Sequence, residues 1–229
     1  MLKRFLILLG LSFILVGCNK RAVTEKVGEI SSWVKDLDLA QTTTQIVAVV
    51  EKEGNATVSL HTQNEEGVWI EVFSVEGRIG KNGLGKTKEG DKKTPTGVYK
   101  FNRAFGILPD PGISALPYLQ VDESHHWVDD SNSKYYNQLV STKEVKVDWT
   151  SAECLYEYTY PYKYVLVLNY NEGCIPGAGS AVFMHCPSER FGKTAGCIAI
   201  PEKNMKILMQ LLREDCMIVI DSEDKIMEY

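Results

Sequence analysis

The chain lacks an excess of positive charge. Its 229 residues carry 25 Lys and Arg against 30 Asp and Glu, which gives a formal net charge of −5. Residues 1–17 hold Lys3 and Arg4 but no acid, so the remainder carries −7. Because the positive charge that neutralises phosphates is missing, nucleic acid is not an expected partner.

Long apolar runs are also scarce. The one at the N-terminus, residues 5–16, is too short to span about 30 Å of hydrocarbon, and it follows a short basic region as in a signal peptide. The Leu-Val-Gly-Cys sequence that ends at Cys18 resembles a bacterial lipobox. This implies that residues 1–17 are a lipoprotein signal peptide, that the Cys18 thiol is lipidated, and that the protein lies in the cell envelope. Its anchor would be the outer face of the cytoplasmic membrane or a membrane on the periplasmic side.

Repeats and low-complexity tracts are absent, and the composition, 44% hydrophobic and 10% aromatic, is that of a folded domain with one core. Short apolar runs separated by Gly and Pro turns predict a mainly β fold, a sandwich or barrel-like mixed sheet. His61 lies on one such strand, where a surface or packing role is expected. Residues 201–215 are the exception, because their apolar residues share one helical face. We expect one helix there, directly after a strand.

The stretch 182–200, VFMHCPSERFGKTAGCIAI, predicts an apolar strand ending in His185, a polar loop, a turn of small residues and a second strand starting at Cys197. A free cysteine is mostly protonated near neutrality and needs a neighbouring base to act as a nucleophile. His185 can be that base. The alternative is that Cys197 is a small buried hydrophobe in an apolar run.

The turn before Cys197 lacks bulk, since it consists of Thr194, Ala195 and Gly196. A substrate carbonyl can therefore approach the backbone amides of Gly196 and Cys197. Two such amides form an oxyanion hole, which usually contributes the largest electrostatic term in acyl transfer.

Together with GKNGLGKTKEGDKKTPTGVYKF upstream, this stretch resembles the YkuD-type L,D-transpeptidase family, cysteine acyltransferases that act on bacterial cell-wall peptides. The resemblance covers about residues 68–221 and implies that His185 is the base and Cys197 the nucleophile. The commonest family form has His before the Gly and Arg two residues after the Cys. Here Ala195 and Ala199 stand at those positions, so the chain resembles a branch with an Ala-Gly-Cys core.

The upstream loop, residues 80–97, is rich in Gly and Lys but leads into a predicted strand rather than a helix, so we do not expect a phosphate loop. Pro95 and Gly97 give turn geometry, while Thr94 and Asp91 can hydrogen-bond the backbone. A structural role is expected, with substrate contact by the lysines as the alternative.

The resemblance implies a reaction with peptidoglycan stem peptides as partners and with no cofactor. Cys197 would attack the carbonyl of the third stem residue and form a thioester, which an amine or water then resolves. The first acceptor gives a transpeptidase and the second a carboxypeptidase. A lipid-anchored binding module with a decayed site is the third alternative, and the retained Cys197 and His185 argue against it.

A loop-like region at 105–137, rich in Pro, Asp, Asn, Ser and aromatics, is the expected flank of the substrate. We expect Trp127, Asp130 and Tyr136 to line a groove there, with Thr194 and Ser180 closer to the thiol. The alternatives are a metal site made by the two histidines and two aspartates of this region, or ordinary surface residues. A zinc site at Cys197 is rejected, because the C-x-x-C spacing and a fourth ligand are missing.

The predicted organisation is a signal peptide at 1–17, a lipid-anchored tether with one short helix at 18–44, and a catalytic domain at 45–229. The four remaining cysteines either form up to two disulfides or are packed thiols. They are Cys154, Cys174, Cys186 and Cys216. Neither the pairing nor the oligomeric state follows from the sequence.

Overall fold

The computed structural model describes residues 32–229. Strands dominate, and within these residues there is one α-helix, α1 (Glu202–Leu211). Five short 3-10 helices complete the structure: η1 (Trp33–Asp36), η2 (Asp38–Gln41), η3 (Leu155–Glu157), η4 (Pro161–Lys163) and η5 (Ile226–Glu228). The strands are β1 (Gln45–Lys52), β2 (Asn55–Gln63), β3 (Trp69–Gly77), β4 (Gly97–Gly106), β5 (Tyr118–Gln120), β6 (His125–Val128), β7 (Leu139–Ser141), β8 (Ala152–Cys154), β9 (Val165–Leu168), β10 (Phe183–His185), β11 (Ile198–Ala199) and β12 (Met217–Ser222).

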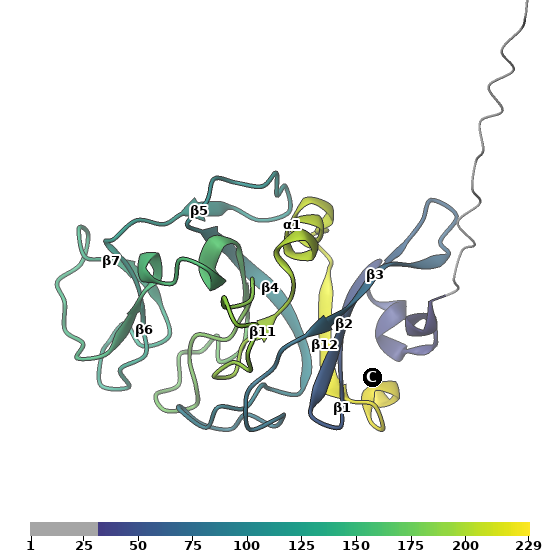
Figure 1. Cartoon of the computed structure of the whole chain (residues 1–229), viewed down its shortest axis with the longest axis horizontal. Coiled ribbons are helices and arrows are strands. Elements are labelled where there is room, and N and C mark those ends of the chain that lie inside the picture. Colours follow the sequence, from purple (N-terminus) through teal and green to yellow (C-terminus); the bar gives the residue numbers. More distant parts are fainter. Residues whose placement is uncertain (1–31) are drawn as a thin grey trace, which may run out of the picture.

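Nine strands form one mixed sheet in the order β11-β10-β9-β4-β12-β1-β2-β3, with β5 pairing β4. The two ends of this order meet, because the Arg78 amide after β3 donates to the Ala199 carbonyl in β11 and the Ala199 amide donates back, both at 2.8 Å. The sheet is therefore almost closed. The expected fold, mainly β with a barrel-like mixed sheet and a helix after the nucleophile strand, is confirmed (Figure 1).

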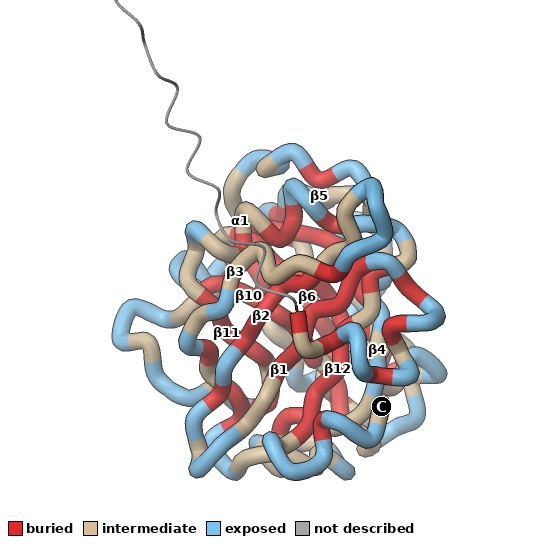
Figure 2. Tube along the Cα trace, turned by 90° about the vertical axis from the view of Figure 1, so that its right-hand side faces the viewer, coloured by how far each residue is buried: buried red, intermediate tan, exposed pale blue. Residues whose placement is uncertain are grey.

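Strand β1 lies near the middle of this sheet, parallel to β12 and antiparallel to β2. Its side chains alternate between two apolar clusters: Val47 and Val49 face the main core, whereas Ile46 and Ala48 face a second cluster. Both faces of the strand are covered, which explains why its sequence is a continuous apolar run rather than an alternation. Figure 2 shows buried backbone along β1, β2 and β12, with exposure at the connecting loops.

The second cluster corrects the expected tether. Val34 on η1, Ala40 on η2 and Leu37 between them are buried against the outer face of β1. Residues 32–44 therefore belong to the folded unit, and only the part of the tether before residue 32 stays a prediction outside the described residues. In place of the one short helix expected in the tether, the segment holds the two 3-10 helices η1 and η2.

His61 helps to attach this segment. It is buried, with Nδ1 bonded to the Ser32 hydroxyl and Nε2 to the Ser59 hydroxyl, each at 2.7 Å. Burial lowers the pKa of His61 to about 4, so the ring is neutral at physiological pH. Of the two roles expected for His61, surface or packing, the structure shows packing.

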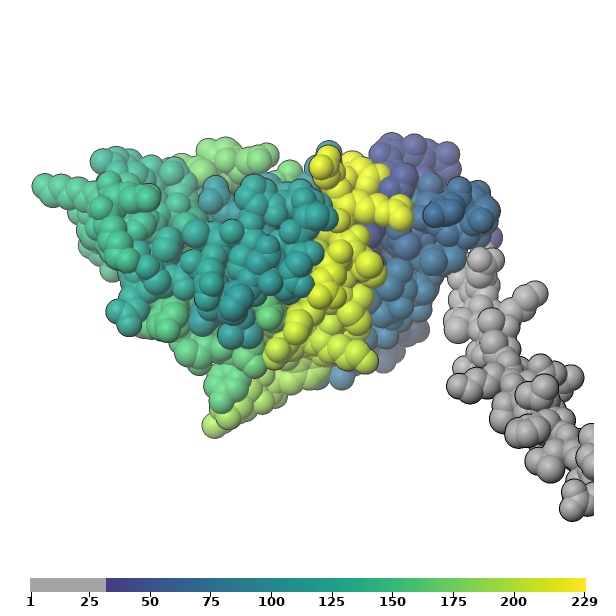
Figure 3. Space-filling view, turned by 90° about the horizontal axis from the view of Figure 1, so that it is seen from above, coloured from purple at the N-terminus to yellow at the C-terminus, as the bar shows by residue number. Residues whose placement is uncertain are grey.

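A small second sheet, β7-β6-β8, lies at the end of the molecule opposite the N-terminal 3-10 helices (Figure 1). An aromatic cluster that includes Phe105, Trp127, Tyr162 and Phe183 joins it to the large sheet, and Cys197 packs at the edge of that cluster. Seen from above, the C-terminal segment separates the N-terminal strands from this middle part of the chain (Figure 3). Across residues 32–229, no helix has the length and hydrophobicity to cross a bilayer.

Candidate active site

The turn that carries Cys197 is attached to the loop 80–97. The Thr94 hydroxyl donates to the Gly196 carbonyl and accepts from the Gly80 amide, both at 2.8 Å. Thr194 bonds the same loop through its backbone, and its hydroxyl donates to the Cys197 carbonyl at 2.6 Å. The structural role predicted for this loop is confirmed, because its threonine fixes the turn before the thiol.

The same loop contains the spacing G-x-x-x-x-G-K-T at residues 80–87, which is that of a phosphate loop. It leads into strand β4 rather than into a helix N-terminus, so it offers no helix amides to a phosphate. Its lysine, Lys86, forms a buried ion pair with Asp91 at 3.1 Å. Asp91 also accepts the backbone amides of Thr87, Lys88 and Lys93, which holds the pKa of its carboxyl at about 2.

Gly196 has a conformation that only glycine adopts readily. Its φ is +145°, and a Cβ on it would lie 2.8 Å from the Lys93 carbonyl oxygen. Its amide donates to the Thr194 hydroxyl at 3.1 Å. The predicted oxyanion role of this amide therefore requires that it exchange the threonine for the substrate oxygen.

We expect Gly196→Ala to lower both stability and activity. The positive φ costs about 1–3 kcal/mol for an L-residue, and a shift of about 1 Å in the nucleophile costs about 10²-fold in rate. Thermal unfolding and the rate of thioester formation measure the two effects. Gly173→Ala is the matched control, because that glycine is exposed and a Cβ on it would lie 3.9 Å from its nearest neighbour, the Ile175 side chain. Equal behaviour of the two variants would contradict the argument.

His185 ends strand β10 and is buried. Its Nδ1 lies 2.5 Å from the carbonyl oxygen of Cys186, and since a carbonyl only accepts, Nδ1 carries the proton. The other nitrogen, Nε2, is then the one with a free lone pair. The edge of the ring packs on Tyr162, with centroids 5.6 Å apart, so its orientation is determined from two sides.

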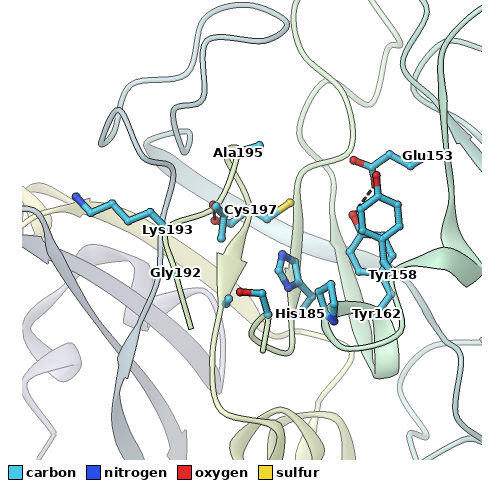
Figure 4. Close-up of a pocket in the computed structure, with 12 residues that line it drawn as sticks. Glu153, Tyr158, Tyr162, His185, Gly192, Lys193, Ala195 and Cys197 are labelled. Carbon is cyan, nitrogen blue, oxygen red and sulfur yellow. Dashed lines mark hydrogen bonds between the residues drawn. The ribbon is translucent and has the colours of Figure 1, made fainter. Parts of the chain in front are cut away.

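The Cys197 thiol lies in the same hollow as this imidazole, the first hollow, together with Tyr158, Tyr162, Lys193 and Glu153. Figure 4 shows the sulfur and the ring projecting into it. The thiol donates to the Ala181 carbonyl at 3.1 Å. Burial raises the pKa of Cys197 to about 12 and lowers that of His185 to about 4. The resting pair is therefore a neutral thiol and a neutral base.

In this arrangement Cys197 can act as a nucleophile although its thiol is protonated at rest. The thiol would lose its proton to His185 as it attacks, since the imidazole is unprotonated over the whole neutral range. A carbonyl compound that displaces the Ala181 contact reaches both groups. The interpretation of Cys197 as a buried hydrophobe does not account for an imidazole with a free Nε2 in the same hollow.

The structure places the other expected residues as follows. Thr194 lines the first hollow, and Ser180 lines a second hollow that also borders Cys197. Tyr136 is buried, and its hydroxyl donates to Glu89 and accepts from the Gly179 amide. Tyr136 borders neither hollow, and its hydroxyl positions Glu89 and the backbone at Gly179.

Trp127 and Asp130 have structural partners. Trp127 packs on Phe183, with ring centroids 4.8 Å apart, and lines a different hollow next to Asn137. Asp130 is buried and uses both carboxylate oxygens to hold Asn132 and Thr150 in a turn. Both residues build the loop region and line neither hollow beside Cys197, and their contact with substrate stays a prediction.

The metal alternative also has no geometric support. In this part of the chain His125 pairs with Asp122, and His126 is bonded to the Ser124 carbonyl. Among residues 32–229 no three His, Cys, Asp or Glu side chains are arranged to hold a metal ion. The five cysteines in the same range are free thiols, so the four for which disulfides were considered are unpaired here, with Cys186 and Cys216 buried and Cys154 and Cys174 half-buried.

Sequence reasoning missed the acids next to the thiol. Glu153 lines both hollows, and its carboxylate accepts the Tyr162 hydroxyl. It lies in an unremarkable segment, and no spacing relative to Cys197 marks it. Only the pairing of β8 with β6, followed by the turn into η4, brings it to the site.

A nearly closed mixed sheet with a Cys–His pair at its edge is the arrangement that a family of known proteins shares. The model of the YkuD L,D-transpeptidase catalytic domain matches residues 47–220. The chain therefore belongs to this family.

Solved structures that resemble the chain include the following two. The helical cell shape determining protein Pgp2 from Campylobacter jejuni is 16% identical, with a TM-score of 0.44, over 79% of this chain and 48% of that one. An L,D-transpeptidase (Yku) from Stackebrandtia nassauensis is 15% identical, with a TM-score of 0.35, over 78% and 55%. The chain thus spans about half the length of each. A comparison with curated proteins finds no match.

Proposed function

We propose that the protein is an L,D-transpeptidase that acts on peptidoglycan stem peptides in cell-wall cross-linking or remodelling. One observation carries the proposal: the His185 ring, with its proton held at Nδ1 by the Cys186 carbonyl, shares a hollow with the Cys197 thiol. The family supplies the class of substrate. No cofactor enters the proposed reaction.

In the first half-reaction the Cys197 proton moves to Nε2 of His185 while the sulfur attacks the carbonyl of the third residue of a stem tetrapeptide. The amide bond to the terminal D-alanine then breaks, and its nitrogen takes the proton from the imidazolium. A thioester remains. The backbone amide of Cys197, with that of Gly196 once Thr194 releases it, would stabilise the oxyanion.

In the second half-reaction an amine or water attacks the thioester carbon, and the sulfur leaves and regains a proton. An amine of another stem gives a cross-link, whereas water gives a tripeptide. The first product identifies a transpeptidase and the second an L,D-carboxypeptidase, and both use the same two side chains. A decayed binding module would form no thioester at all.

Mass spectrometry of the purified protein incubated with a disaccharide tetrapeptide tests the proposal. We expect a mass increase on Cys197 that matches the acyl group, together with release of D-alanine. An unmodified protein with intact tetrapeptide would overturn the proposal. A carbapenem serves as an independent acylating probe of the thiol.

We further propose that the protein is held in the cell envelope by a lipid on Cys18, which lies outside the described residues. The support is the lipobox-like Leu-Val-Gly-Cys after a short apolar run. Labelling of cells with a fatty-acid analogue tests it. Equal labelling of the protein and its Cys18→Ala variant would contradict the anchor.

A further inference from the structure

A second hollow borders Cys197 on the side of the loop 80–97, and its chemistry differs from that of the first. The first hollow contains His185, Tyr158 and Tyr162. The second contains three carboxyl groups, from Glu89, Asp129 and Glu153, beside Ser180. Cys197 and Glu153 line both hollows, so a group bound in either one is next to the sulfur.

The cations at this second hollow do not neutralise the acids. Lys86 lines the second hollow, but its ammonium group forms the buried ion pair with Asp91. Lys92 lies at the exposed surface. Two of the acids also differ in their partners: Glu89 accepts the hydroxyls of Tyr136 and Ser180, whereas Asp129 has a fully buried Oδ1 without any partner.

The unpaired oxygen adds uncompensated negative charge beside the hollow that Glu89, Glu153 and Cys197 also line. It is the only buried side-chain nitrogen or oxygen in residues 32–229 without a hydrogen-bond partner. Leaving a buried acceptor unpaired is costly, and an ordered water, an ion or a bound donor group are the partners that relieve such a cost. A carboxylate oxygen accepts only, so a hydrogen-bonding partner of it is a donor.

Glu153 is equipped to exchange a proton with that donor. Its Oε2 accepts the Tyr162 hydroxyl, and within the described residues the carboxyl group forms no other hydrogen bond, which leaves Oε1 for a ligand. Burial, with the charges of Asp129 and Glu89, raises the pKa of Glu153 to about 7, although the Tyr162 bond acts in the opposite direction. A carboxyl group in this state takes up and releases protons near neutrality.

We propose that the second hollow binds the primary ammonium group of the acyl acceptor, and that Glu153 removes a proton from it. The inference rests on the proposed function and makes the acceptor an amine rather than water. Asp129 and Glu89 attract the cation, and Glu153 converts it into a nucleophile beside the thioester on Cys197.

The step balances as follows. The acceptor R–NH₃⁺ gives one proton to the Glu153 carboxylate and becomes R–NH₂. Its nitrogen attacks the thioester carbon, and the adduct loses a second proton to Nε2 of His185. The C–S bond breaks, and the sulfur takes that proton from the imidazolium. The products are an amide, the Cys197 thiol and a protonated Glu153, which releases its proton to solvent.

The test uses the full chain, a disaccharide tetrapeptide as donor, and an N-acetylated tripeptide with a free side-chain amine as acceptor. The ratio of amide product to hydrolysed product is measured, along with the rate of thioester formation. Glu153→Gln keeps an acceptor for Tyr162, and we expect the ratio to fall about 10²-fold while the thioester still forms. Glu157→Gln, a change at an exposed glutamate in η3, is the matched control.

A pH series separates proton transfer from a structural role. The aminolysis rate of the wild-type protein should show an inflection near pH 7 that Glu153→Gln lacks. In Tyr162→Phe it should move to higher pH, because the lost hydrogen bond favours the charged carboxylate.

An unchanged product ratio in Glu153→Gln would overturn the inference and leave the proposed function intact. The same holds if the product ratio of the wild-type protein is equal with the tripeptide acceptor and with a tripeptide whose side-chain amine is acetylated. The absence of a thioester in the wild-type protein would overturn both.

Discussion

Cys197→Ala is expected to abolish thioester formation while the protein remains folded. The sulfur is the atom that bonds to the substrate, and the neighbouring groups only move protons, so nothing else in the first hollow can replace it. Removal of a nucleophile from comparable acyl-transfer sites costs on the order of 10⁶-fold. Mass spectrometry with the tetrapeptide or a carbapenem should show no acyl adduct.

Stability should change little in this variant. The substitution removes one sulfur atom from a half-buried position, where loss of a small group costs about 1 kcal/mol. Cys154→Ala is the control, because that thiol is also half-buried but borders neither hollow. An adduct that persists in Cys197→Ala, or disappears in Cys154→Ala, would contradict the assignment of the nucleophile.

His185→Ala is expected to slow thioester formation by about 10² to 10⁴-fold, the usual contribution of a general base. The effect should lie toward the large end, because the pKa of the Cys197 thiol is raised to about 12 and an unassisted thiolate is correspondingly rare. Stopped-flow or quenched measurements of the first half-reaction give the rate. His126→Ala is the control, since that ring bonds the Ser124 carbonyl outside both hollows.

The pH dependence of the same rate follows from the lowered pKa of His185. The base works when it is unprotonated, and that form dominates above the pKa of about 4. The rate of thioester formation should therefore hold as pH falls through 6.5, the ordinary value for histidine, and decrease only as pH approaches about 4. A loss centred near pH 6.5, or a less than threefold effect of His185→Ala, would contradict this role of the imidazole.

Several features of the protein could be predicted from residues alone because they depend on local order. The apolar runs with Gly and Pro turns indicated strands, the spacing of Met205, Leu208, Met209 and Leu212 indicated α1, and the stretch 182–200 indicated the thiol and the imidazole. Asp91 was correctly interpreted as a turn residue for the same reason, since the amides that it accepts lie within its own loop. Thr94 also bonds the Gly80 amide of that loop, but its bond to the distant Gly196 carbonyl could not be predicted.

Contacts with distant partners could not be predicted. Trp127, Asp130 and Tyr136 were assigned to a groove from the composition of their loop, but each is used to build the loop or its support. Exposed and buried aromatics look alike in a sequence without regular periodicity. The segment 32–44 was assigned to a tether, yet its buried residues join Trp69, Val219 and Ile226 in covering the outer face of β1.

The strand-rich fold and the Cys–His pair that we propose to react could be predicted from residue order, because strand periodicity and a Cys–His motif are encoded in neighbouring residues. The protonation state of that pair and the acids around it follow from the folded arrangement alone. Burial sets the pKa values of Cys197 and His185, and burial is a property of the closed sheet. Glu153 is 44 residues before Cys197 in the chain, and only the folding of the small sheet against the large one brings its carboxyl to the thiol.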